Sequence, residues 1–281
     1  MKFTKMHGTG NDFVLVDGRA EKQDWNTLAV AMCDRHFGIG GDGILVVRDS
    51  MSAEYQMRMF NPDGSESEMC GNGIRCFTKY LFDNGLASKG ASQARIETLA
   101  GIRQVTYIKG TGGIDRVRVG MGKPILRPQE VPVAARGEGP LLDYPVTVDG
   151  RTVAVTCVSM GNPHAVAFVD KPVKDWPLER VGPLMEHHSF FPRRVNFEIA
   201  NVKDRAHVDA RVWERGAGLT LACGTGACAV AVAARLHGLV EDNVDVTLPG
   251  GTLHMEWDGR GEVWLEGPAE TVFEGVWARA T

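Results

Sequence analysis

Two stretches of the chain have apolar residues at helical spacing, and the same short motif precedes both. In the first stretch, apolar side chains recur at positions i, i+3 and i+7, at Ile74, Phe77 and Leu81. In the second stretch, they form one face at Ala227, Val230, Ala231 and Ala234. Gly85 and Gly238 follow as stop signals. Because Ala and Val occupy nearly all sides of the second stretch, we expect that helix to be buried.

Short runs rich in Val, Ile, Phe and Thr, typical of β-strands, surround both helices. We expect strands at 11–17, 43–48, 55–60, 94–99, 103–108 and 115–120, and then at 152–158, 164–169, 194–200, 207–213, 244–248, 252–257 and 263–266. Two further helices are predicted near 25–36 and 177–187. Many strands and few helices favour an α+β fold, in which a curved, mostly antiparallel sheet wraps around one central helix in each half of the chain.

The chain repeats itself with a long period. Cys70-Gly71-Asn72-Gly73 and Cys223-Gly224-Thr225-Gly226 stand 153 positions apart, and the same offset aligns Gly85 with Gly238. A period this long indicates two similar domains and excludes a solenoid. We place the first domain at 1–122 and the second at 123–267, and we interpret the proline-rich segment from Met121 to Pro145 as the crossing between them.

Charge and cysteine content exclude several classes of protein. The formal net charge is −4 and no basic block occurs, so we expect no nucleic-acid partner. No apolar run approaches the roughly 18 residues of a membrane span, and the polar N-terminus does not resemble a signal peptide, so we expect no membrane partner and a cytoplasmic location. In that compartment the six cysteines are expected to be thiols. Their spacing matches no zinc motif, so we expect no metal site.

A cysteine followed by glycines at the start of a helix is suited to acid–base chemistry. The first N–H groups of a helix have no internal partner, and the helix dipole adds positive charge there, which favours a thiolate and binds a carboxylate. Two copies related by a pseudo-twofold axis could place two thiols on opposite sides of one substrate. Inversion of a stereocentre needs a base on one face and an acid on the other, and a thiolate and a thiol supply both without a cofactor.

Several longer motifs resemble the signature of the diaminopimelate epimerase family. The most specific is the segment from Asn61 to Cys76, which reads NPDGSESEMCGNGIRC. The others are HGTGNDF at 7–13, GNPH at 161–164, VNF at 195–197, WERG at 213–216 and ACGTG at 222–226. The resemblance runs from residue 3 to about 267.

This resemblance implies a cofactor-independent epimerase that interconverts LL- and meso-diaminopimelate, a small-molecule substrate, in the synthesis of lysine and peptidoglycan precursors. By matching motif positions, Cys70 and Cys223 are the base and acid pair, and His164 and Glu214 tune their pKa values. The expected substrate-binding residues are Asn11, Asn61, Gly71, Asn72, Asn162, Asn196, Glu214, Arg215, Gly224 and Thr225. The family also implies a homodimer, and a C-terminal segment, 268–281, that completes the first domain.

One position departs from the family, and other interpretations stay open. Many members have a substrate-binding Gln directly after the motif that ends in Asp42, where this chain has Gly43. The segment from Gly38 to Gly43 fits G-x-G-x-x-G, but a strand follows it where the dinucleotide motif needs a helix, which argues against nucleotide binding. The alternative functions are a proline racemase or hydroxyproline epimerase, and a non-catalytic amino-acid-binding protein, which would need neither cysteine.

Overall fold

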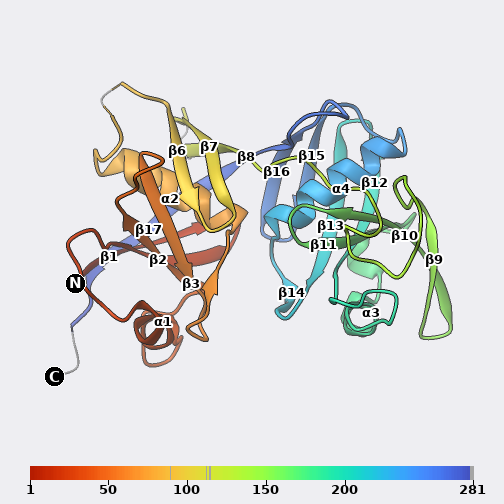
Figure 1. Ribbon diagram of the computed structural model, residues 1–281, viewed down its shortest axis with the longest axis horizontal. Coiled ribbons are helices and arrows are strands. Elements are labelled where there is room, and N and C mark those ends of the chain that lie inside the picture. Colours follow the sequence, from red (N-terminus) through yellow and green to blue (C-terminus); the bar gives the residue numbers. More distant parts are fainter. Residues whose placement is uncertain (89, 112, 114, 279–281) are drawn as a thin grey trace. The chain divides into compact units, whose positions relative to one another are not determined.

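The computed structural model describes residues 1–88, 90–111, 113 and 115–278. By their internal contacts the residues group into two compact units, which we call unit 1 and unit 2 (Figure 1). Unit 1 comprises Met1–Gly120 and the chain from Glu266 on, and unit 2 comprises Met121–Leu265.

Unit 1 is a ring of strands around one helix. Its elements are β1 (Lys2–Gly8), β2 (Asn11–Asp17), α1 (Trp25–Cys33), β3 (Gly43–Arg48), β4 (Tyr55–Phe60), β5 (Glu66–Ser67), α2 (Gly71–Asp83), β6 (Gln93–Thr98), β7 (Gly101–Ile108) and β8 (Asp115–Gly120). Around the ring, β1–β2, β3–β4, β6–β7 and β7–β8 are antiparallel, and β2–β3 and β4–β6 are parallel. The last strand of the chain, β17 (Trp264–Val276), pairs with both β1 and β8 and closes the ring.

Unit 2 repeats this pairing pattern. Its elements are β9 (Tyr144–Val148), β10 (Arg151–Ser159), β11 (Pro163–Phe168), the short 3-10 helix η1 (Val173–Asp175), α3 (Leu178–Glu186), β12 (Asn196–Asp204), β13 (His207–Glu214), β14 (Gly218–Thr220), α4 (Gly224–Leu236), β15 (Asn243–Leu248) and β16 (Gly251–Glu256). Antiparallel β10–β11, parallel β11–β12, antiparallel β12–β13, parallel β13–β15 and antiparallel β15–β16 follow one another. The same alternation in unit 1 gives the two units their pseudo-symmetry.

The central helices correspond residue by residue. Each has 13 residues and begins directly after its cysteine. The helix α2 packs against β1, β2, β3, β4, β7 and β8, and α4 packs against β10, β11, β12, β13, β15 and β16 (Figure 1). Each helix is followed by a glycine in the left-handed region, Gly85 at φ +65° and Gly238 at φ +68°, where other residues would be strained.

The peripheral helices cover a second apolar core in each unit. In unit 1, Ala29 and Met32 of α1 pack in one cluster with Val14 and Val46 of the sheet. In unit 2, α3 contributes residues such as Val181 to a cluster of its own. The side chain of Asp24 caps α1 by accepting a hydrogen bond from the backbone N–H of Thr27 at 3.2 Å.

The predicted fold class, an α+β fold with a mostly antiparallel sheet around one central helix per half, is confirmed. Several details differ, among them the following. The strand β1 does not follow from the pattern because it mixes polar and apolar residues, although its Thr4 and Lys5 are buried. Strand β9 begins inside the segment expected to cross between the domains and contains Pro145. The helix expected to end near residue 36 ends at Cys33.

Candidate active site

Cys70 is the N-cap residue of α2. Its backbone is extended, with φ −136° and ψ 124°, and its sulfur accepts a hydrogen bond from the backbone N–H of Gly73 at 3.4 Å. The thiol is half-buried and also donates to Oδ1 of Asn11 at 3.7 Å. The sulfur therefore lies at the positive end of the helix dipole and is hydrogen-bonded to Asn11, the first residue of β2.

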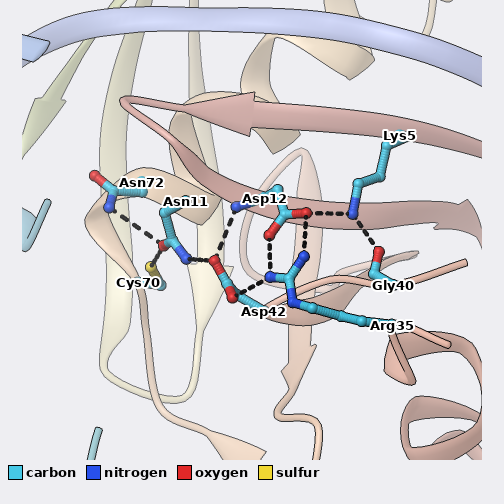
Figure 2. Close-up of polar contacts among 8 residues, drawn as sticks. All are labelled: Lys5, Asn11, Asp12, Arg35, Gly40, Asp42, Cys70 and Asn72. Atoms are coloured by element: carbon cyan, nitrogen blue, oxygen red, sulfur yellow. Dashed lines mark hydrogen bonds and ion pairs between the residues drawn. The ribbon is translucent and has the colours of Figure 1, made fainter. Parts of the chain in front are cut away.

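Asn11 joins the helix start to an acidic side chain (Figure 2). Its Oδ1 accepts from Nδ2 of Asn72 at 3.2 Å, and its own Nδ2 donates to Oδ2 of Asp42 at 2.5 Å. Asp42 also accepts from the backbone N–H of Asp12 at 3.1 Å. Because a carboxylate only accepts hydrogen bonds, Asp42 holds the NH₂ group of Asn11 and so directs the oxygen of that amide towards Cys70.

Two cations balance the two aspartates. Arg35 donates to Asp12 at 2.8 Å and to Asp42 at 2.7 Å, and Lys5 lies 2.6 Å from the other oxygen of Asp12 (Figure 2). Lys5 also donates to the carbonyl oxygen of Gly40. Burial alone would raise the pKa of Asp12, but the hydrogen bonds from Arg35 and Lys5 outweigh it and hold that pKa far below its usual range.

Arg75 supports Asn72 from inside the unit. Its side chain is fully buried and donates to Oδ1 of Asn72 at 3.0 Å, to the carbonyl oxygen of Gly71 at 3.1 Å and to the hydroxyl of Thr9 at 3.1 Å. A further bond runs to the carbonyl oxygen of Pro268 at 3.2 Å. The guanidinium thus fixes the amide orientation of Asn72 and leaves its NH₂ group to Asn11.

Cys223 holds the matching position in unit 2. It is the N-cap residue of α4, with φ −119° and ψ 115°, and its sulfur lies 3.5 Å from the hydroxyl of Thr225. Burial raises the pKa of Cys223 well above its usual range, and the charge of Glu214 adds to this. The hydroxyl of Thr225 and the backbone N–H of Gly226 oppose the rise. Burial therefore favours the thiol form of Cys223, and its neighbours influence how easily it ionises.

A chain of polar side chains leads from this sulfur into the core. Nδ2 of Asn162 donates to Thr225 at 3.2 Å, and Oδ1 of Asn162 lies 3.0 Å from Nε2 of His164. Nδ1 of His164 lies 2.7 Å from Oε1 of Glu198, and both of these side chains are at most 1% exposed. The predicted residues Asn162, His164 and Thr225 are thus connected with Cys223 in one network.

Three other predicted residues lie on β12 and at the end of β13. Asn196 is buried, donates to the carbonyl oxygen of Pro163 at 2.9 Å and accepts from the backbone N–H of Arg215 at 2.9 Å. Glu214 accepts a hydrogen bond from Thr220, and desolvation raises the pKa of its carboxyl group. The side chain of Arg215 is exposed and donates to the carbonyl oxygen of Arg193 at 3.3 Å. In this conformation the side chain of Asn196 holds the backbone at Pro163 and at Arg215.

Asn61 belongs to a turn. Its Nδ2 donates to the hydroxyl of Ser65 at 3.0 Å, and its backbone N–H donates to the carbonyl oxygen of Ser65 at 2.8 Å. Both of these hydrogen bonds stabilise the turn itself and leave the side-chain oxygen of Asn61 to other partners. A role of Asn61 in substrate binding stays a prediction.

The other four cysteines, Cys33, Cys76, Cys157 and Cys228, are buried free thiols. Burial raises the pKa of Cys33 to about 11 and the pKa values of Cys76 and Cys157 to about 12, which disfavours the reactive thiolate form. Over residues 1–88, 90–111, 113 and 115–278, no three His, Cys, Asp or Glu side chains are grouped as metal ligands.

Asp42, Arg75 and Glu198 take part in these networks and were not predicted. Asp42 ends the motif before Gly43, and Arg75 lies inside the long motif, so both stood beside recognised residues. Glu198 is a charged residue within a buried strand of apolar neighbours, and that pattern is itself a signal for a paired polar group.

Comparison with known proteins gives one consistent family. The profile described as Diaminopimelate epimerase matches residues 3–126 and 156–272. A diaminopimelate epimerase of Acetivibrio thermocellus is 51% identical over 277 residues, which cover 98% of each chain. One from Leptospira biflexa is 47% identical over 279 residues, again 98% of each chain.

Solved structures with much lower identity share the fold. A phenazine biosynthesis protein of the PhzF family from Bacillus anthracis superposes with a TM-score of 0.68 at 17% identity, covering 98% of each chain. A hydroxyproline epimerase from Agrobacterium vitis has a TM-score of 0.68 at 15% identity, covering 98% of this chain and 91% of the other.

Within the described residues, no helix has the length and apolar character needed to cross a membrane.

Proposed function

We propose, because this chain belongs to the diaminopimelate epimerase family, that it is an isomerase that interconverts LL- and meso-diaminopimelate without a cofactor. The reaction inverts one α-carbon. It would serve the synthesis of lysine and peptidoglycan precursors.

The observation that carries this proposal is the duplicated cysteine at a helix start. Cys70 and Cys223 each cap a 13-residue central helix with the same extended backbone, and each sulfur contacts a polar partner at 3.7 and 3.5 Å respectively. In the proposed reaction, one cysteine as thiolate removes the α-proton, and the other as thiol delivers its proton to the opposite face. The first cysteine is then a thiol and the second a thiolate, so the reverse reaction uses the same groups.

The helix starts would also hold the carboxylate at the reacting carbon. The backbone N–H groups at Gly71 and Asn72, and those at Gly224 and Thr225, lie in the first turns of α2 and α4. Such groups bind anions and stabilise the negative charge that develops as the α-proton leaves. We expect His164 and Glu214 to tune the thiol pKa values.

The remaining polar residues would recognise the distal ammonium and carboxylate groups. Asn11, Asn61, Asn162 and Asn196 offer both donors and acceptors, Glu214 can pair with an ammonium, and Arg215 can bind a carboxylate with two hydrogen bonds. A substrate without the distal groups would leave them unpaired, which lowers its rate strongly. The side chain of Arg215 is exposed and can turn towards a ligand.

Deuterium exchange tests the proposal. The protein is incubated with LL-diaminopimelate in D₂O under reducing conditions without pyridoxal phosphate. We expect deuterium at the α-carbon as the meso isomer accumulates, and loss of meso formation in both Cys70→Ala and Cys223→Ala. Cys33→Ala is the matched control, since Cys33 is a buried thiol outside the site. Absence of exchange would refute the proposal, and exchange with proline instead would select a proline racemase.

A cytoplasmic location and a homodimer are further predictions of this proposal. Size-exclusion chromatography with light scattering measures the mass directly. Twice the chain mass of 30.6 kDa is expected.

A further inference from the structure

We infer that Glu198 is a positioning residue for Cys223, acting through His164 and Asn162. The inference rests on the proposed function for the catalytic role of the thiolate alone. Its test measures how readily Cys223 ionises and needs no turnover. Within the described residues, the hydrogen bonds of Glu198 lead to the sulfur of Cys223 through His164, Asn162 and Thr225.

The direction of the hydrogen bonds carries the argument. Nδ2 of Asn162 donates to Thr225, so the group of Asn162 that faces His164 is its oxygen, which can only accept. Nε2 of His164 must therefore carry a hydrogen. Since Thr225 already accepts from Asn162, its own hydroxyl hydrogen is available to the sulfur of Cys223, 3.5 Å away. Every donor from the imidazole onwards thus points towards Cys223, the direction that stabilises a thiolate.

Glu198 sets that direction at the buried end. Oε1 of Glu198 lies 2.7 Å from Nδ1 of His164, so a hydrogen bond joins these two atoms, while Nε2 keeps the hydrogen that faces Asn162. Oε2 of Glu198 accepts no hydrogen bond from the residues that the structure describes. A buried carboxyl group without a hydrogen-bond partner is costly in a core, so the hydrogen bond to the imidazole stabilises Glu198 at this position. Without Glu198, the hydrogen of His164 could lie on Nδ1 in place of Nε2. The amide of Asn162 could then rotate, which would reverse the direction of the hydrogen bonds that lead to Cys223.

The opposite direction would stabilise the thiol. If Nε2 of His164 accepts, the NH₂ group of Asn162 turns to it, Thr225 donates to Asn162, and the thiol of Cys223 donates to Thr225. Replacement of Glu198 therefore changes how readily Cys223 ionises, although the link between the two side chains is indirect. The charged and titratable groups that face this network are Glu198 on β12, Glu214 on β13 and His164 on β11.

Charge and positioning predict opposite signs. As a nearby negative charge, Glu198 disfavours the thiolate of Cys223, so its removal should make the thiolate easier to form. As a positioning residue, it favours the thiolate. Glu198→Ala removes both effects, whereas Glu198→Gln removes the charge and keeps a hydrogen-bond partner for His164.

The test is the rate of alkylation by iodoacetamide, followed from pH 7 to about pH 10.5 and resolved by peptide mass spectrometry. We expect Glu198→Ala to slow alkylation of Cys223 about tenfold at pH 8 and to move its pH profile upwards by about one unit. Glu198→Gln should react at least as fast as the unchanged protein. Cys70 in the same molecules is the internal control, and its rate should stay unchanged.

A second variant keeps the inference falsifiable if Glu198→Ala perturbs the local fold. In Asn162→Ala the chain is already broken, so adding Glu198→Ala should no longer slow alkylation of Cys223. Unchanged or faster alkylation in Glu198→Ala alone, equal slowing in the Gln variant, or additive slowing in the double variant would each overturn the inference. Deuterium exchange, measured separately, reports on the proposed function.

Discussion

The amide of Asn11 is held at its nitrogen by Asp42, at 2.5 Å, so that its oxygen faces Cys70. In unit 2 the corresponding amide, that of Asn162, is held at its oxygen by His164 at 3.0 Å and presents its nitrogen to the helix start. Cys70 thus contacts the accepting end of Asn11 directly, whereas the donating end of the equivalent Asn162 reaches Cys223 through the hydroxyl of Thr225. The pseudo-symmetric backbone supports a chemically asymmetric pair.

Asp42→Asn should reduce kcat about tenfold with little change in KM. The amide has one accepting oxygen where the carboxylate has two, so it can no longer accept from both Arg35 and Asn11. The amide of Asn11 is then free to rotate, at a cost of the order of 1.5–3 kcal/mol for a charged hydrogen bond. Asp17→Asn is the matched control, because Asp17 lies at the other end of β2 and forms its ion pair with Arg19, two residues away. Steady-state kinetics with both variants distinguishes the two, and equal activity would contradict the assigned role.

Asp12 should make unit 1 sensitive to acid. Its pKa is depressed in the folded state, so its contribution to stability is present above the unfolded pKa of about 4 and is lost as the pH falls towards the folded value. Asp12→Asn should therefore lower the free energy of local unfolding at pH 7 by about 1–3 kcal/mol, and the difference should shrink below about pH 4. Hydrogen exchange of peptides from residues 2–17 measures this, and a difference independent of pH would refute it.

Gly226→Ala should lower turnover more than Gly73→Ala does. It disturbs the surroundings of Cys223, whereas Gly73→Ala leaves those of Cys70 largely unchanged. A Cβ atom at Gly226 would lie 2.9 Å from Oε1 of Glu198 and 3.2 Å from Cβ of Cys223, so the carboxyl group must move away from His164. At Gly73 the nearest atom is a flexible Leu45 methyl at 3.3 Å, and Ala gains about 1 kcal/mol of helix propensity.

We expect at least a fivefold loss of turnover in Gly226→Ala and less than a twofold loss in Gly73→Ala. Thermal melting serves as the control for folding in both variants. The reverse order of the two activities would show that contact with Glu198 is unimportant.

Gly43→Gln should destabilise unit 1 although many family members have Gln there. A Cβ atom at Gly43 would lie 2.8 Å from the carbonyl oxygen of Phe60, and that atom belongs to the neighbouring strand β4. The backbone of β3 or of β4 must therefore shift to make room for the side chain. We expect a Tm lower by several degrees and no gain in activity, whereas Gly139→Gln, at an exposed position with no atom nearby, should leave the Tm unchanged. A rise in kcat/KM would contradict this expectation, because it would show that a Gln side chain at position 43 can make the substrate contact found in other family members.

The sequence predicts the central helices better than the networks around their cysteines. Helix α2 begins one residue after Cys70 because apolar periodicity, a tight glycine motif and a stop glycine all agree. Strand β1 is not predicted because its buried Lys5 is neutralised by Asp12, a partner that periodicity does not reveal. Glu198 is missed for the same reason, since its partner His164 lies 34 positions away and only strand pairing brings them together.

The path of β17 imposes an order on the assembly of the chain. Unit 2 is formed by one continuous segment, whereas unit 1 needs Glu266 and the residues after it to pair with β1. During synthesis, the edges of β1 and β8 therefore stay open until all of unit 2 has left the ribosome. Open strand edges are templates for aggregation, so unit 1 has the longer vulnerable period, and slow translation after residue 265 would prolong it.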